Sequence, residues 1–129
     1  MSAIPDDAPD TVGRRKRLVA LCRGLPDVSA ERAGVDHLSF KVGKKVFAYY
    51  TYDHHGDGMI AFLCKAPAGE QARLVKEDPT RYFVPPYVGP RGWVGVRLDG
   101  RTVNWREVKN LAYAAYFLTA PDRPRKRAG

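Results

Sequence analysis

The chain has few cysteines, no long apolar segment and few catalytic motifs, and each shortage excludes a class of protein. Only two of its 129 residues are cysteines, Cys22 and Cys64, which is too few for a disulfide framework or a zinc site. Both have apolar neighbours, so we expect small buried side chains in a reducing compartment. No apolar run reaches the roughly 18 residues of a membrane-spanning helix.

Motifs for catalysis are equally scarce. None of the three serines stands in a nucleophile-elbow sequence. Gly89, Gly92 and Gly95 do not have the spacing of a phosphate loop or of a dinucleotide-binding turn. We therefore expect neither an enzyme nor a cofactor.

Positive charge is what the chain has in excess. It carries 22 Lys and Arg against 14 Asp and Glu, a net charge of 22 − 14 = +8. Such a protein attracts polyanions at long range and in a salt-dependent way, without any implied sequence preference. The excess charge points to a nucleic acid or another polyanion as partner.

Length and composition are typical of one soluble domain. We expect this domain over residues 10–120, between a disordered N-terminus, 1–9, and a free basic tail, 121–129. The first ten residues are polar and acidic, unlike a secretory signal. We therefore expect a cytoplasmic monomer with no membrane partner.

Apolar spacing predicts three helices, over residues 11–25, 67–78 and 104–119. The basic run 14–17 falls on the polar side of the first helix, and we interpret it as a solvated face. Asn104 caps the last helix, with Glu107 three residues further on. The predicted buried stripe of this last helix is Val108, Leu111, Ala112, Ala115 and Leu118.

Alternating apolar residues predict strands over 37–42, 45–52, 59–65 and 93–98, short extended chain at 82–84 and a loop at 26–35. Helices at both ends and antiparallel strands between them are typical of an α+β two-layer sandwich. We expect both terminal helices on one face of the sheet and solvent on the other.

The register of the first hairpin decides which of its residues face outward. A two-residue loop at Gly43-Lys44 sets Phe40 opposite Phe47 and Leu38 opposite Tyr49. A loop one residue longer would set Phe40 opposite Ala48 and lose the aromatic pair, so we predict the shorter loop. The outward residues are then Ser39, Lys41, Ala48 and Tyr50.

One turn combines several metal-ligand types: Asp53, His54, His55 and Asp57. Adjacent histidines at the end of a strand point apart, which makes one shared ion difficult. Asp and Gly are also ordinary turn residues. We therefore interpret the segment as a turn without a metal.

The chain resembles the MmcQ/YjbR-like family of small bacterial proteins over roughly residues 11–120. The matching pieces are Leu25-Pro26, the hairpin 40–48, Cys64-Lys65, Gly89-Pro90-Arg91-Gly92-Trp93-Val94 and the aromatic last helix. This resemblance implies a frataxin-like fold and DNA binding by likeness to a double-wing architecture. The chain departs from the family at Ala115, where relatives often have serine before the tyrosine.

Charge and resemblance together predict a DNA-binding surface on the hairpin wing and the open face of the sheet. Lysines there would neutralise phosphates, and aromatic rings would stack on unpaired bases. The candidate contact residues are Lys41, Lys44, Lys45, Tyr50, Arg91, Trp93 and Arg97.

The alternative is a module that binds a small ligand or a protein and has no nucleic-acid role. Tyr113, Tyr116 and Phe117 of the last helix exceed what one buried stripe needs. A concave apolar pocket would favour this alternative, and a continuous positive face would favour DNA.

Overall fold

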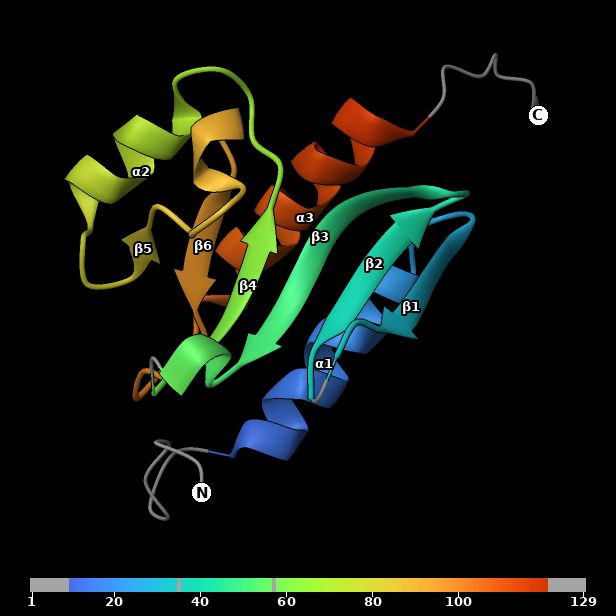
Figure 1. Ribbon diagram of the computed structural model, residues 1–129, viewed down its shortest axis with the longest axis horizontal. Coiled ribbons are helices and arrows are strands. Elements are labelled where there is room, and N and C mark those ends of the chain that lie inside the picture. The colour runs from blue at the N-terminus through green and yellow to red at the C-terminus, as the bar shows by residue number, and fades with distance from the viewer. Residues whose placement is uncertain (1–9, 35, 57, 121–129) are drawn as a thin grey trace.

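Six antiparallel strands form one sheet in the order β1-β2-β3-β4-β6-β5 (Figure 1). This computed structural model describes residues 10–34, 36–56 and 58–120, so the predicted N-terminus 1–9 and basic tail 121–129 lie outside the described residues. The strands are β1 (Val28–Arg32), β2 (Leu38–Val42), β3 (Lys45–Tyr52), β4 (Ile60–Cys64), β5 (Tyr82–Phe83) and β6 (Val94–Arg97).

Three α-helices accompany the sheet, α1 (Thr11–Arg23), α2 (Glu70–Glu77) and α3 (Trp105–Thr119), with short 3-10 turns η1 (His54–Gly56) and η2 (Gly89–Arg91). The Asp10 carboxylate accepts a hydrogen bond from the Gly13 N–H at 2.8 Å and starts α1. The Asn104 side chain does the same for Glu107 at 3.1 Å and starts α3. The predicted α+β class and these helix starts are confirmed. No helix in the described part of the chain is long and apolar enough to cross a bilayer.

The predicted loop at 26–35 is wrong, because it contains β1. This strand pairs with β2 from Val28, opposite Val42, to Arg32, opposite Leu38. Its residues are half-buried or exposed, as on an edge strand, and give only a weak alternation. Pairing with β2, which the local sequence does not reveal, makes it a strand.

The hairpin loop has the predicted two residues, since Val42 pairs with Lys45, but the register beyond it is wrong. Phe40 lies opposite Ala48, because a bulge follows the pair of Lys41 and Val46. The bulge turns both Phe47 and Ala48 into the core. The Phe47 ring packs there against the ring of Tyr116 at 5.9 Å, edge to face.

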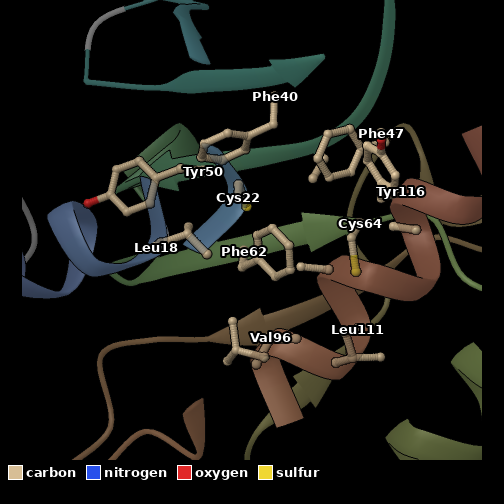
Figure 2. Close-up of a cluster of buried hydrophobic side chains, with 14 of the residues drawn as sticks. Leu18, Cys22, Phe40, Phe47, Tyr50, Phe62, Cys64, Val96, Leu111 and Tyr116 are labelled. Atoms are coloured by element: carbon tan, nitrogen blue, oxygen red, sulfur yellow. The ribbon is translucent and has the colours of Figure 1, made fainter. Parts of the chain in front are cut away.

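Helices α1 and α3 cover one face of the sheet, called here the inner face, as predicted (Figures 1 and 2). Leu18 and Cys22 from α1 and Leu111 from α3 are buried there. The predicted stripe of α3 is wrong at its last member: Leu118 is 52% exposed and Tyr116 is buried instead. The Tyr116 hydroxyl donates to the backbone carbonyl of Pro26 at 2.8 Å, which accounts for this preference.

The opposite face of the sheet, called here the outer face, is not open to solvent over its centre, contrary to the prediction. Ala61, Leu63 and Trp93 are buried there beneath a second, smaller apolar cluster that includes Val88. The Gln71 side chain of α2 donates to the carbonyls of Gly89, at 2.8 Å, and Trp93, at 2.5 Å. These bonds hold the proline-rich segment 84–92 against the outer face.

Candidate nucleic-acid interface

The two aromatic members of the predicted DNA surface are buried. Tyr50 is 0% exposed and lies beside Phe40 and Leu18 on the inner face (Figure 2). Its predicted outward position is wrong, because the bulge after Lys41 shifts the register. Trp93 does lie on the outer face, but it is 4% exposed and packs against Tyr49 at 5.7 Å. Neither ring is accessible for stacking on a base.

Two of the predicted cations have acidic partners. The Lys41 ammonium lies 3.0 Å from a carboxylate oxygen of Glu31, on the neighbouring strand. The Arg97 guanidinium makes two contacts with Asp99, at 2.9 and 3.1 Å. These carboxylates offset part of the positive charge of the outer face, which weakens it as a phosphate-binding surface.

The remaining predicted cations are exposed, but they do not form one cluster. Lys44 and Lys45 lie at the tip of the β2–β3 hairpin. Arg91 belongs to η2, which Gln71 ties to α2 through the carbonyl of Gly89. In Figure 1 the hairpin tip and α2 lie at opposite sides of the sheet. The single contact surface that the sequence predicted for these residues is therefore not formed.

A groove of about 660 Å³ between α1 and the edge of the sheet gathers positive charge instead. In the part of the chain that the structure describes, none of the side chains that line it is a carboxylate. They are Arg15, Lys16, Val19, Ala20, Arg23, Gly24, Ala30 and Leu38.

Helical geometry explains how α1 presents these cations. Residues three and four positions apart share a helix face, so Lys16 lies in line with Arg23, seven residues further on. Arg15 stands three residues before the buried Leu18 and seven before the buried Cys22, at the border between the groove and the buried face.

The interpretation of the basic run 14–17 as a solvated face is therefore wrong for part of the run. Arg14 donates hydrogen bonds to the carbonyls of Leu98, at 2.7 Å, and Arg101, at 3.0 Å, and so fixes α1 to the end of β6. The Arg17 guanidinium lies 4.7 Å from the ring centre of Trp105, a cation–π contact with α3. Of the four, only Arg15 and Lys16 line the groove.

Burial keeps ionisable groups of the inner face in their neutral forms. Burial raises the pKa of Tyr50 to about 12, although the nearby positive charge of Arg15 opposes this. The Tyr50 hydroxyl has no hydrogen-bond partner among the described residues. Burial also raises the pKa of the Cys22 thiol to about 12 and raises that of Cys64. Neutral thiols of this kind are poor nucleophiles.

A second hollow, called here the outer pocket, lies on the opposite face of the sheet and was not predicted. It measures about 230 Å³ and is rich in aromatic rings. Its lining residues are Ala33, His37, Tyr49, Thr51, His54, Leu63, Pro86, Tyr87 and Val88. The only sequence signal for it was the rigid Pro85-Pro86 pair, which places Tyr87 over the strands.

The turn after β3 uses its aspartate to hold the backbone. The carboxylate of Asp53 accepts a hydrogen bond from the Gly58 N–H at 2.9 Å. Asp57 lies outside the described residues, as does the side chain of His55. Within the described part of the chain, no group of three or more His, Cys, Asp or Glu is arranged to hold a metal ion.

Comparisons with known proteins agree with this architecture. A family model described as YjbR matches residues 23–118. The chain is also similar to the crystal structure of a Deinococcus radiodurans protein with the domain called DUF419, at a TM-score of 0.67 and 25% identity, covering 81% of this chain and 76% of that one. No curated protein matches the chain. The family match begins at Arg23 and so includes the outer pocket and one of the three groove cations.

Proposed function

The chain belongs to the YjbR family, and from the groove beside α1 we propose that it is a non-catalytic protein that binds the phosphate backbone of DNA. One observation carries this proposal: Arg15, Lys16 and Arg23 line a single groove to which no described residue contributes a carboxylate. Phosphates bind where several cations converge, since each contact releases counterions.

The tip of the β2–β3 hairpin extends the positive groove. The Gly43 N–H donates to the backbone carbonyl of Asp27 at 3.1 Å, so this tip lies against the loop that follows α1. Lys44 and Lys45 are therefore near the Arg23 end of the groove. A nucleic-acid backbone following α1 meets the groove first and the hairpin wing second.

The interface contacts phosphates rather than base edges. Flexible cations carry no sequence code by themselves. With Tyr50 and Trp93 buried, no aromatic ring of the predicted set stacks beside the groove. We therefore expect binding with little sequence preference and a strong dependence on salt. The neutral, buried thiols of Cys22 and Cys64 support a non-catalytic role.

Charge reversal in the groove tests the proposal. In the triple variant Arg15→Glu, Lys16→Glu, Arg23→Glu, we expect duplex DNA to bind at least about tenfold more weakly. The slope of log affinity against log salt should fall by about 3, one for each lost phosphate contact. Fluorescence anisotropy with a labelled duplex at several salt concentrations measures both quantities.

A matched control separates the groove from net charge. The triple variant Lys76→Glu, Arg91→Glu, Lys109→Glu changes three exposed cations outside the groove by the same total charge. We expect it to lose much less affinity than the groove variant. Equal losses in the two variants, or no DNA binding by the unaltered chain at low salt, would reject the groove as the interface.

A further inference from the structure

We propose that the outer pocket binds one unstacked nucleobase. The base comes either from a single strand held by the groove or from a free nucleoside. Binding of a base from a single strand rests on the proposed function, whereas binding of a free nucleoside does not. The inference depends on the pocket's size, its ring surfaces, its uncharged lining and its place beside the groove.

Size limits the ligand to a single ring system. At about 230 Å³ the outer pocket is smaller than the roughly 300–1,000 Å³ of sites for drug-sized molecules. Tyr49, backed by the buried ring of Trp93, provides a wall on the sheet. The His37 and His54 rings meet edge to face at 5.2 Å, and the ring of Tyr87 follows at 6.4 Å from His54. Flat ring surfaces of this kind bind planar ligands.

Polar groups of the pocket match the edge of a base. The Nδ1 atom of His37 accepts a hydrogen bond from the Tyr52 N–H at 3.0 Å. A neutral His37 must then carry its proton on Nε2, which leaves an N–H donor. Thr51, which is 7% exposed, adds a hydroxyl to the lining of the pocket. A donor beside a hydroxyl that both donates and accepts suits the mixed edge of a nucleobase.

Charge excludes the competing ligand classes. Among the described residues that line the outer pocket there is no lysine, arginine or carboxylate. A phosphate or an aromatic acid placed there would lose its hydration without meeting the ammonium or guanidinium group that usually compensates the loss. A neutral heterocycle avoids this cost, so the base enters the pocket and its phosphate stays outside.

Tyr87 is held at the rim of the pocket by a strained backbone. Its φ of 67° lies in the left-handed region, which residues with a β-carbon seldom adopt. Backbone hydrogen bonds fix the turn, from Val88 to Pro86 at 2.7 Å and from Gly89 to Pro85 at 2.9 Å. The side chain is nevertheless 76% exposed. An aromatic ring that contributes little to the core yet is held in this way indicates a contact with a ligand.

The pocket and the groove lie on the two sides of the β1–β2 hairpin. Ala30 and Leu38 line the groove, whereas Ala33 and His37 line the outer pocket. His37 and Leu38 are neighbours whose side chains point to opposite faces of the sheet. A single strand that crosses this edge can therefore leave its phosphates in the groove and place one base in the pocket.

The experiment uses the full chain and two probes. Adenosine is titrated into ¹⁵N-labelled protein, and an oligothymidine with one central 2-aminopurine is titrated while that base's fluorescence is followed. We expect adenosine to shift amides of the outer pocket and to leave those of α1 unchanged. We expect Tyr87→Gly, which keeps the left-handed backbone, to weaken both probes about fivefold or more.

Two further variants complete the test. Thr51→Val keeps the shape of the side chain and removes its hydroxyl, and should weaken adenosine binding. Phe117→Ala removes an exposed ring from α3, outside the pocket, and should change neither probe. Adenosine binding that shifts no pocket amide, or that is unaltered in Tyr87→Gly, would overturn the proposal.

The failures of the two proposals are distinguishable. If the groove variant loses the oligonucleotide but keeps adenosine, both proposals hold. If duplex DNA binds but adenosine does not bind at the pocket, the pocket proposal fails and the groove stands. If adenosine binds at the pocket and no oligonucleotide binds, the pocket takes a free nucleoside and the groove proposal fails.

Discussion

The two faces of the sheet are built in different ways. On the inner face, α1 and α3 complete one continuous cluster in which Phe40, Phe47, Tyr50 and Phe62 are all fully buried (Figure 2). The outer face has a cluster with only three buried members, and the segment 84–92 covers it. The inner face holds the fold together, whereas the outer face leaves space for a pocket.

The difference also separates two kinds of backbone. The inner face is made by regular helices whose ends are capped by Asp10 and Asn104. The segment over the outer face contains three prolines and a left-handed Tyr87. Such a segment fixes the position of a few side chains without burying much surface. We infer that stability resides mainly on the inner face and ligand recognition at the edges and on the outer face.

The largest expected effect breaks the inner face. Phe62 and Leu63 are neighbours in β4, buried on the inner and the outer face respectively. We expect Phe62→Ala to lower the free energy of unfolding by about 3–5 kcal/mol and Leu63→Ala by about 2 kcal/mol. Urea denaturation measures both. If Leu63→Ala lowered the free energy of unfolding as much as Phe62→Ala, the proposed difference between the two faces would be wrong.

A smaller effect loosens the outer face alone. Gln71→Ala removes both hydrogen bonds to the carbonyls of Gly89 and Trp93, and we expect a loss of about 2 kcal/mol. Amide exchange should accelerate in segment 84–92 more than in α3. Lys76→Ala, an exposed change on the same helix, serves as the control and should stay within about 0.5 kcal/mol. Uniform acceleration throughout the sheet would show that the segment is not a separate unit.

The smallest effect concerns the buried hydroxyl of the inner face. Since the Tyr50 hydroxyl has no partner among the described residues, we expect Tyr50→Phe to raise the free energy of unfolding by about 1 kcal/mol. The same variant should bind DNA as the unaltered chain does. A loss of DNA affinity would restore the contact role that the sequence predicted for this residue.

Tyr50→Phe also changes the response to alkali. The pKa of Tyr50 is raised from 10.0 to about 12 in the folded protein. Between these values the unfolded chain has lost the proton that the native state keeps, so stability falls as pH rises. This contribution is fully present below pH 10. The variant should therefore lose stability less steeply than the unaltered chain between pH 10 and 12.

Local sequence predicted the elements whose signals are local. The start of the first helix at Thr11, the cap at Asn104, the two-residue hairpin loop and the class of fold follow from spacing and turn chemistry. The register of β3 could not be predicted in this way, because Phe40 is buried whether it lies opposite Phe47 or opposite Ala48. A contact between Phe47 and Tyr116 of α3 accompanies the bulge, and no local pattern contains this distant partner.

The sequence predicted that the candidate site is positively charged, but it did not predict where the site lies. Arg15 and Lys16 belong to a basic run that the sequence shows directly. The opposite wall of their groove includes β1, which was predicted to be a loop. Nor does the sequence show that Arg14 and Arg17 are engaged by carbonyls and by Trp105. The packing of α1 against the rest of the domain decides which cations of the run 14–17 make structural contacts and which line the groove.

We propose that DNA lies along α1 and the hairpin tip, and not on the outer face over Trp93. An amide chemical-shift titration of the ¹⁵N-labelled chain with a short duplex tests it directly. We predict the largest shifts from Arg15 to Gly24, in β1 and at Lys44 and Lys45. Shifts centred on Trp93 and Arg97, with α1 unaffected, would contradict the account.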